Sequence, residues 1–428
     1  MLRKRGFRPR RTKKQIIQAE KKIEQTGTSI LDITDSVLID ILLRFPIKSI
    51  IMCKCVCKPW HRVISDPNFA KMHFARAEPC PLIRTLGGSG VSRMLYLIEP
   101  SEININYAGE KAVDLRLDTR LKIPLRNIEM LPENDADDYK LCSRGSNCNG
   151  SFKRRCVKVT AKEQKFHIVN SCNGFLCLSD PLNNNPLVVC NPVTGEYLNL
   201  PKTNEFDESS KDMMTCGFGI SNKSNQYTVL RMLTGKRELC CCPITGKEIF
   251  SSQMAEVHVL GTSSWRCIGH APYSGKKLKF MIYLSGSVYW ACDESRMIYS
   301  FDFDEAKFRA IEPPPYADMW PAGWYKVALG MLVGRLSLCR TSISSDEVRV
   351  WILETNGELT AWKEFKTIHL GGDDSVFFYS RLEFGLCKYF RIQLAKAKFA
   401  AVTYIPSFIC LKDVVQGDWF EILNVNSE

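Results

Sequence analysis

Histidine is scarce in this sequence, and the short motifs on which most hydrolases and nucleotide-dependent enzymes depend are missing. Six histidines occur in 428 residues, with no Gly-x-Ser-x-Gly elbow, no Gly-x4-Gly-Lys-Ser/Thr loop and no His-Glu-x-x-His motif. Asp302 and Asp304 alternate along a predicted strand and could form a carboxylate pair, but they are better explained as caps of the following turn. We therefore expect a protein without catalytic residues and without a cofactor.

Long apolar runs are also missing. No segment approaches the roughly 18 consecutive apolar residues that a membrane-spanning helix needs. The N-terminal region lacks the apolar core of a secretory signal and is poor in serine for an organelle transit peptide. We expect no membrane partner and a location in the nucleus and/or cytoplasm.

Cysteine, in contrast, is abundant, but its distribution argues against disulfides and metal sites. Nineteen cysteines are an odd number, and some are adjacent, as in Cys240-Cys241-Cys242, so they cannot all pair. The natural interpretation is reduced thiols that act as small buried apolar groups. Cys142, Cys148, Cys156 and His167 are spaced irregularly without a Cys-x-x-Cys knuckle, and we do not expect them to bind zinc.

The positive charge is concentrated at the N-terminus. Of the formal net charge of +12, residues 1–22 carry +9, from ten Lys or Arg and one Glu, which leaves +3 on the other 406 residues. Residues 1–28 are predicted to form a basic disordered tail. This tail is either a nuclear-import or polyanion-binding patch or a solubilising arm, and the sequence leaves both open. The small charge on the remainder argues against a nucleic-acid-binding fold.

Residues 29–76 are predicted to be helical and carry more apolar surface than they can bury against themselves. In the first helix, projected at about 100° per residue, apolar side chains cover well over twice the arc that a surface helix needs. These side chains are Val37, Leu38, Ile39, Ile41, Leu42, Leu43 and Phe45. Pro46 ends this helix, a second apolar segment covers residues 47–56, and Pro59 and Pro67 mark the starts of two further helices. The excess apolar surface predicts docking to another protein.

The order of these elements resembles the F-box, the adaptor-binding module of SCF-type ubiquitin ligases, and its plant form in particular. The matching residues are Leu38, Ile41-Leu42-Leu43-Arg44-Phe45-Pro46, Ile47-Lys48-Ser49, Val56-Cys57-Lys58-Pro59-Trp60 and Ile64-Ser65-Asp66-Pro67-Asn68-Phe69. The resemblance implies that a Skp-type adaptor binds here and connects the chain to cullin and RING subunits. The adaptor-binding residues that it implies are Ile33, Thr34, Leu38, Ile41, Leu42, Pro46, Ile47, Val56, Lys58 and Trp60. The alternative is an ordinary helical subdomain whose second apolar face packs on the rest of the chain.

The start of the helical block departs from the family pattern. The F-box usually opens with Leu-Pro, whereas this sequence has Ile33-Thr34. The Thr34 hydroxyl can cap the helix, and the Asp35 carboxylate is favourable at the positive end of the helix dipole. We expect helix initiation to survive, although the missing proline ring removes one expected contact with the adaptor.

From about residue 80 onward, short apolar runs alternate with Gly, Asn, Asp, Ser and Pro clusters, which is typical of antiparallel strands. A glycine precedes a strand in 173–178, 285–290 and 333–338, and each such phrase is followed by a strand, a turn and an aromatic residue. Gly286 to Gly334 is 48 positions and Gly174 to Gly286 is 112, or two intervals of 56, with Cys216–Gly219 near the missing middle position. A repeat near 50 residues with four short strands predicts kelch-like propeller blades. The recurring aromatics Tyr197, Trp265, Phe308 and Trp362 are expected to pack between blades.

The same phrases are similar to the F-box-associated domain of plant F-box proteins. The similarity is strongest in NSCNGFLCLSD, NPVTGEYLNLP, CGFGISNKSNQYTVLRM, EVHVLGTSSWRCIG, GSVYWACDESRMIYSFDFDEAKF and YIPSFICLKD. The predicted fold is α+β and multidomain, with a three- to four-helix F-box before an all-β, kelch-type propeller-like domain. The predicted boundaries are a tail at 1–28, the F-box at 29–76, opening strands and a polar loop at 80–169, the propeller-like domain at 170–415 and a C-terminal tail at 416–428.

Together, the F-box-like block and the propeller-like domain indicate a protein that connects two others. By the resemblance it is a substrate-recognition subunit of a ubiquitin ligase, and its propeller-like domain binds a protein substrate. The candidate substrate contact is the proline-restricted loop with Tyr316, Trp320 and Trp324, although its tryptophans could instead fill a gap between blades. The competing interpretations are a basic-tailed nuclear nucleic-acid-binding protein with a propeller scaffold and, less favoured, a propeller hydrolase.

Overall fold

The computed structural model describes two compact units, residues 1–69 and 70–428, which are treated separately below. The described residues are 33–85, 94–99, 119–124, 166–180, 183–202, 214–234, 239–241, 248–250, 253–272, 281–292, 295–314, 325–332, 334–342, 347–356, 359–369, 375–380, 387–392, 399–415, 417 and 420–427.

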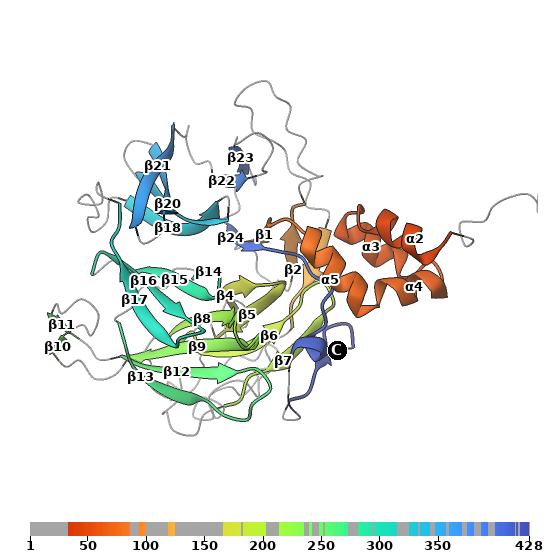
Figure 1. The fold of residues 1–428 in the computed structure, drawn as a ribbon, viewed down its shortest axis with the longest axis horizontal. Coiled ribbons are helices and arrows are strands. Elements are labelled where there is room, and N and C mark those ends of the chain that lie inside the picture. Colours follow the sequence, from red (N-terminus) through yellow and green to blue (C-terminus); the bar gives the residue numbers. More distant parts are fainter. Residues whose placement is uncertain are drawn as a thin grey trace, which may run out of the picture. The chain divides into compact units, whose positions relative to one another are not determined.

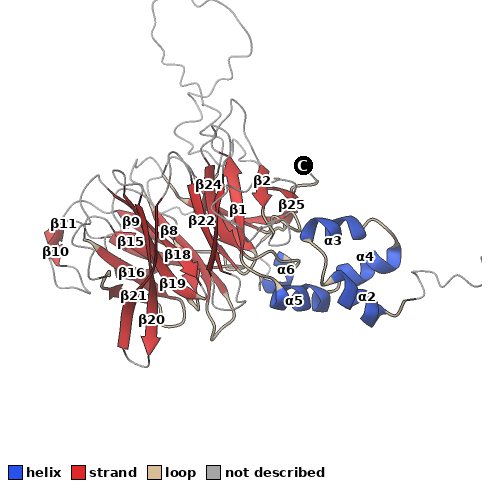
Figure 2. Cartoon of the chain, turned by 90° about the horizontal axis from the view of Figure 1, so that it is seen from above, coloured by secondary structure: helices blue, strands red, loops and turns tan. Residues whose placement is uncertain are grey.

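The first unit is helical, as the sequence predicts (Figure 2). Its helices are α2 (Asp35–Leu42), α3 (Ile47–Cys53) and α4 (Lys58–Ile64), followed by α5 (Pro67–Arg76), which crosses into the second unit. Pro46 separates α2 from α3, and Pro59 lies in the first turn of α4. The Asp66 carboxylate accepts the backbone N–H of Asn68 at 2.7 Å, which caps the start of α5.

The predicted cap at the start of α2 is wrong in one detail. The Thr34 side chain makes no cap hydrogen bond, and its hydroxyl lies 3.2 Å from the Ser36 hydroxyl instead. Asp35 does occupy the first turn, where its charge favours the helix dipole. Helix initiation therefore survives through Asp35 and not through the Thr34 hydroxyl.

The second unit is an all-β propeller with five blades in its described part (Figure 1). Blade 1 is β24 (Phe399–Tyr404), β1 (Cys80–Thr85), β2 (Met94–Leu97) and β3 (Thr119–Lys122). Blade 2 is β4 (His167–Cys172), β5 (Phe175–Ser179), β6 (Pro186–Cys190), β7 (Glu196–Asn199) and β25 (Leu423–Asn424). Blade 3 is β8 (Thr215–Ile220), β9 (Tyr227–Thr234), β12 (Gln253–Val259) and β13 (Arg266–Ala271).

Two further blades complete the ring, and two small hairpins are added to it. Blade 4 is β14 (Ile282–Leu284), β15 (Ser287–Cys292), β16 (Met297–Asp302) and β17 (Lys307–Ile311), and blade 5 is β18 (Tyr325–Leu332), β19 (Arg335–Ser342), β20 (Glu347–Asn356) and β21 (Leu359–His369). The hairpins are β10 (Leu239–Cys241) with β11 (Glu248–Phe250) and β22 (Ser375–Ser380) with β23 (Cys387–Ile392). The first strand of each of blades 2 to 5 contacts the first strand of a neighbouring blade, and β24 contacts β4. These five are the inner strands of the propeller.

The apolar cores lie between successive blades, as expected where each sheet buries its face against its neighbours. One buried cluster joins blades 2 and 3, a second joins blades 3 and 4, and a third joins blades 4 and 5. Tyr197 is buried, and Trp265, Phe308 and Trp362 pack against these clusters. The prediction that these recurring aromatics are packing residues is confirmed.

The segments predicted before and after the propeller-like domain, opening strands with a polar loop at 80–169 and a tail at 416–428, both contribute strands to blades. β1 pairs in register with β24 from Cys80↔Tyr404 to Thr85↔Phe399, so the first strand of this unit and a strand near its C-terminus close the ring within one sheet (Figure 1). β25 adds a fifth strand to the outer edge of blade 2. The predicted boundaries differ from this arrangement because local alternation predicts a strand but not its distant partner.

The recurring glycines occupy the hairpins that connect the first two strands of a blade. Asn173-Gly174 and Ser285-Gly286 both have positive φ at both positions, 47° and 87° and then 48° and 85°, as a tight two-residue hairpin requires. Cys216–Gly219 is an exception, because it lies within the inner strand β8. A Cβ at position 219 would lie 2.1 Å from the Phe303 ring, so this glycine allows blade 4 to approach β8 closely.

Two buried asparagines cross-link blades through their side-chain amides. Asn170 donates to the Phe218 carbonyl at 2.7 Å and accepts the Phe218 N–H at 2.9 Å, which joins the inner strands of blades 2 and 3. Asn191 donates to the carbonyls of Ser407 and Ile409 at 3.0 and 2.8 Å. Asn191 is thereby the main polar link from blade 2 to the segment that follows the closing strand β24.

The C-terminal segment is held along blade 2 by several further contacts. The Glu196 carboxylate accepts the N–H of Leu411, at the start of α6 (Leu411–Val414), at 2.8 Å, and the Tyr404 hydroxyl donates to the Gly174 carbonyl at 2.9 Å. The phrases NPVTGEYLNLP and YIPSFICLKD are thus bonding partners in the fold. These bonds hold the segment after β24 against blade 2 and so support closure of the propeller ring.

The end of α5 belongs to the propeller unit. His73 is buried and meets the Phe408 ring edge to face, with ring centroids 5.0 Å apart. Burial lowers the pKa of His73 to about 4, so the imidazole is neutral at neutral pH. The boundary between the units therefore falls inside the fourth predicted helix.

Two tryptophans make equivalent links between successive blades. The Trp265 indole N–H donates to the Pro201 carbonyl at 2.9 Å, and the Trp362 indole N–H donates to the Glu312 carbonyl at 2.8 Å. Each acceptor follows the fourth strand of the preceding blade. The Arg231 guanidinium also lies over the Trp265 ring at 4.0 Å and is paired with Glu256 in the interior.

Trp265→Phe should therefore destabilise the propeller more than Trp362→Phe. Loss of the indole hydrogen bond costs about 1 kcal/mol, and at position 265 the weaker cation–π attraction of a phenyl ring adds part of the roughly 0.5–2 kcal/mol that such a contact contributes. The described contacts of Trp362 include no stacked guanidinium. The stability lost by Trp362→Phe should therefore stay at the roughly 1 kcal/mol of the hydrogen bond alone. Chemical denaturation of both variants measures the difference, and equal or reversed losses would contradict this assignment.

Candidate functional site

The large apolar side chains that are exposed in the described part of the chain all lie between residues 37 and 72. They are Val37, Ile41, Phe45, Met52, Val56 and Met72. The first five belong to the helical unit and are termed here the exposed apolar set. Exposed fractions of 51% for Val37, 63% for Met52 and 61% for Val56 are high for side chains of this type. Such a concentration is typical of an interaction surface.

Helix α2 shows how the sequence produces this surface. Leu38 and Leu42, four residues apart, are buried at 4% and 0% exposure, whereas Val37 and Ile41, also four apart, are exposed. Residues at i and i+4 share one face of a helix, so α2 has one apolar face for its own unit and another for solvent. The excess apolar arc predicted from the sequence is therefore real.

Two carboxylates of α2 form charged pairs. Arg44 bonds the Asp40 carboxylate at 2.9 Å, one helical turn away, and Arg62 of α4 lies 3.5 Å from the Asp35 carboxylate. All four side chains are well exposed, and such pairs contribute little to stability. They add charged groups to the surface of the helical unit beside the exposed apolar set.

The structure divides the ten predicted adaptor-binding residues into two groups. Buried in the folded chain are Leu38, Leu42, Ile47 and Trp60, while Ile33 and Pro46 are half-buried and Thr34, Ile41, Val56 and Lys58 are exposed. The four buried side chains serve packing in the free chain and are not surface contacts as they stand. The contact role of the other six stays a prediction. The predicted adaptor-binding residues do not include Val37, Phe45 and Met52, although Val37 and Phe45 belong to the predicted apolar arc and Met52 lies four residues before Val56.

Thr34→Pro should tighten binding to a Skp-type adaptor several-fold without harming the fold. Thr34 has φ −64° and ψ 147°, which is the backbone conformation that proline prefers, so the substitution restores the family residue without strain. Calorimetric titration of the variant and the unaltered chain gives the two affinities. A weaker complex at unchanged melting temperature would show that the ring makes no contact here.

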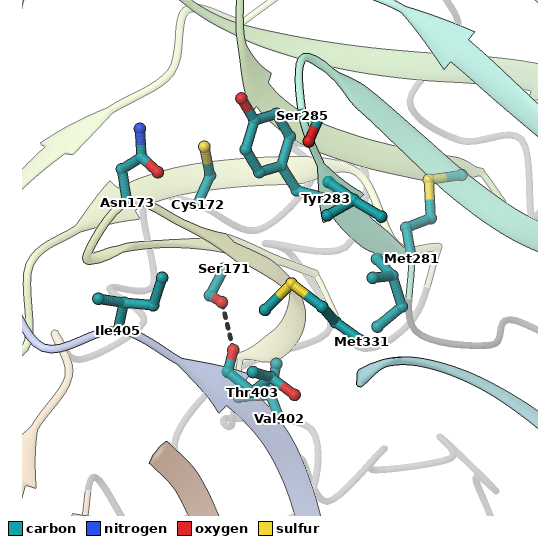
Figure 3. A pocket seen from close by; sticks show the side chains of 12 residues that line it. Ser171, Cys172, Asn173, Met281, Tyr283, Ser285, Met331, Val402, Thr403 and Ile405 are labelled. Carbon is teal, nitrogen blue, oxygen red and sulfur yellow. Dashed lines mark hydrogen bonds between the residues drawn. The ribbon is translucent and has the colours of Figure 1, made fainter. Parts of the chain in front are cut away.

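The propeller contains a cavity of about 200 Å³ where four inner strands meet (Figure 3). Its walls come from the ends of β4, β14, β18 and β24. The lining residues are Ser171, Cys172, Asn173, Met281, Ile282, Tyr283, Leu284, Ser285, Met331, Val402, Thr403 and Ile405. The predicted contact residues Tyr316, Trp320 and Trp324 lie outside the described residues.

Asp302 and Asp304 bond the backbone of turns in the propeller. Asp302 accepts the N–H groups of Asp304 and Glu305 at 2.9 and 3.0 Å, which confirms the predicted turn cap for Asp302, whereas the Asp304 carboxylate bonds the neighbouring blade. The Lys223 N–H and the Ser221 hydroxyl hold the pKa of the Asp304 carboxyl below its usual range, which links the turns of blades 3 and 4.

The cysteines and helices of the described part bear on three further features: nucleophilic thiols, metal sites and membrane-spanning helices. Burial raises the pKa of Cys172, Cys177 and Cys190, so these thiols are poor nucleophiles. Among the described residues no group of three His, Cys, Asp or Glu could hold a metal ion, and Cys142, Cys148 and Cys156 lie outside them. No described helix is both long and apolar enough to cross a membrane.

The chain combines a helical unit that exposes apolar side chains with a propeller, and comparison with known proteins identifies the family. The F-box domain model matches residues 30–72, and the F-box associated beta propeller domain model matches residues 134–376. The chain belongs to the plant F-box proteins that carry this propeller domain.

Similar proteins occur in Arabidopsis thaliana. F-box protein At3g07870 is 24% identical over 358 residues, which cover 79% of this chain and 73% of that protein. F-box/kelch-repeat protein At3g17530 is 25% identical over 345 residues, which cover 78% and 75%. Among solved structures, dihydro-heme d1 dehydrogenase NirN in complex with DHE matches at a TM-score of 0.25 and 11% identity over 71% of this chain and 56% of that chain, a likeness too low to carry an argument.

Proposed function

We propose that this protein is the substrate-recognition subunit of an SCF-type ubiquitin ligase. The helical unit docks on a Skp-type adaptor, which connects the chain to the cullin and RING subunits, and the propeller binds a protein substrate. The observation that carries the proposal is the exposed apolar set, because it lies on the segment that matches the F-box.

The proposed mechanism is positional. A substrate held on the propeller has its lysines near the ubiquitin-conjugating enzyme, and such proximity replaces a slow bimolecular encounter by an effectively intramolecular one. Close links such as the Asn170–Phe218 pair make the propeller a stiff platform for this purpose. No residue of this chain needs to touch the reacting bond, so we propose a non-catalytic role.

Affinity purification of the intact chain from plant cells, with neddylation and the proteasome blocked, tests this proposal. It predicts that adaptor, cullin and RING subunits are recovered together, and that the block enriches a substrate. Recovery of the intact, folded chain without any adaptor would contradict it.

The basic tail is proposed to act apart from ligase assembly, and the protein is proposed to reside in the nucleus and/or cytoplasm. Deletion of residues 1–22, which carry ten basic residues, should leave adaptor affinity unchanged and reduce nuclear accumulation or retention on polyanions. Imaging of tagged chains and binding to heparin measure these effects. Unchanged localisation and retention would assign the tail to solubility alone, and reduced adaptor affinity would contradict its independence.

A further inference from the structure

The cavity at the centre of the propeller has an exposed end and a buried end. Asn173, Ser285 and Ile405 directly follow the inner strands β4, β14 and β24, so they lie at the same end of the cavity. Ser285 is exposed, and Asn173 and Ile405 are half-buried. Deeper in the strands, Met281 and Val402 are buried at 1% and 7% exposure. The cavity therefore opens at the end where these hairpins and the exit of β24 meet.

The lining is apolar apart from its mouth. Figure 3 shows the side chains of Met281, Met331 and Val402 around the cavity, with the Asn173 amide and the Ser285 hydroxyl at its edge. The polar groups of the wall already have partners within the protein. Ser171 donates its hydroxyl to the Thr403 carbonyl, and the Tyr283 hydroxyl accepts the Gly286 N–H at 3.2 Å. Water would find few partners here, and apolar cavities of this kind accept apolar guests.

The walls cannot collapse easily into this space. β4 is fixed to β8 by the Asn170 amide and to the β24 segment through the Ser171 hydroxyl, and the Tyr404 hydroxyl bonds the Gly174 carbonyl at 2.9 Å. A pocket that is already formed costs little to occupy, because few side chains must be ordered on binding. The two methionines provide an adaptable surface within this fixed frame.

We propose that this cavity is an anchor pocket that receives one large apolar side chain, such as Leu, Met or Phe, from the protein substrate. The inference rests on the proposed function, since it identifies a binding point for that substrate. A volume of about 200 Å³ accommodates a single side chain of this class but not a folded element. The Ser285 hydroxyl at the mouth is exposed and can bond a backbone amide that flanks the inserted residue, whereas the Asn173 side chain is hydrogen-bonded to the Tyr227 hydroxyl. Hot spots of protein interfaces commonly take this form, with one apolar anchor inside a formed pocket.

The test uses the intact chain and the acetylated amides of single amino acids as probes. Ligand-observed NMR should detect N-acetyl-leucinamide and N-acetyl-phenylalaninamide at dissociation constants of about 6–80 mM, as expected for burial of one apolar side chain. N-acetyl-aspartamide should not bind. Met331→Trp and Ile405→Phe fill the cavity from two walls. Each should weaken the affinity for the apolar probes at least tenfold. Met297→Trp is the matched control, because Met297 is a half-buried methionine outside the cavity, and it should bind the probes as the unaltered chain does.

Adaptor affinity measured on the same samples separates the two proposals. Normal adaptor binding without any apolar probe binding overturns the anchor pocket alone, whereas failed adaptor binding overturns the proposed function. Equal probe binding by all three variants, each with an unchanged melting temperature, places the probes elsewhere and overturns the pocket. Binding of toluene without binding of the amides overturns it in favour of a site for a free small molecule.

Discussion

Ile41→Asp should weaken binding to a Skp-type adaptor by at least two orders of magnitude while leaving the fold intact. Ile41 is exposed in the free chain, so a carboxylate there stays hydrated until the adaptor covers it. Burial of a large aliphatic side chain contributes about 1.5–3 kcal/mol, and a buried unpaired carboxylate adds a further penalty. Calorimetric titration gives the affinity, and circular dichroism checks the fold.

Two variants of the same helix control this experiment. Ser36→Asp adds the same charge next to Val37, outside the exposed apolar set, and should change affinity only slightly. Leu42→Asp places the charge at a fully buried position and should unfold the helical unit. Equal binding by the Ile41 variant and the unaltered chain would show that the adaptor does not use this face.

Asn191→Asp should cost the propeller about 3–5 kcal/mol, because it breaks a buried polar link while its shape is kept. Asn191 is fully buried, and its amide donates to the carbonyls of Ser407 and Ile409. A carboxylate has no proton to donate and would face both carbonyl oxygens. The segment that follows β24 would lose the two hydrogen bonds that Asn191 donates to it from blade 2. Denaturant unfolding measures the resulting loss of stability.

Asn424→Asp is the matched control for that loss. Asn424 is half-buried, and its amide donates one hydrogen bond, to the Thr194 carbonyl at 3.2 Å. The same chemical change should cost about 0.5–1.5 kcal/mol there. Similar losses at positions 191 and 424 would contradict the role given to Asn191 in ring closure.

Features set by neighbouring residues could be predicted from the sequence, and features set by distant partners could not. The hairpin at Ser285-Gly286 and the turn cap at Asp302 depend on a few adjacent residues, so their patterns were sufficient. The bonds from Asn191 to Ser407 span 216 positions, and nothing next to Asn191 indicates where its partner lies. The β1–β24 pairing escaped prediction for the same reason.

The docking surface shows a different limit. The apolar arc of α2 predicts two apolar faces, but it does not show which of them packs within the helical unit and which stays exposed. Leu38 and Leu42 were therefore grouped with Ile41, although the structure buries the first two and exposes the third. Only packing against the other helices distinguishes them.

The central claim is that the exposed apolar set docks on a Skp-type adaptor, and titration of the intact chain with a purified adaptor tests it most directly. We predict a one-to-one complex with a dissociation constant of about 1 μM or tighter, as expected for an apolar interface of ordinary size. An intact, folded chain that shows no binding heat and no co-elution at adaptor concentrations of about 50 μM would contradict the account.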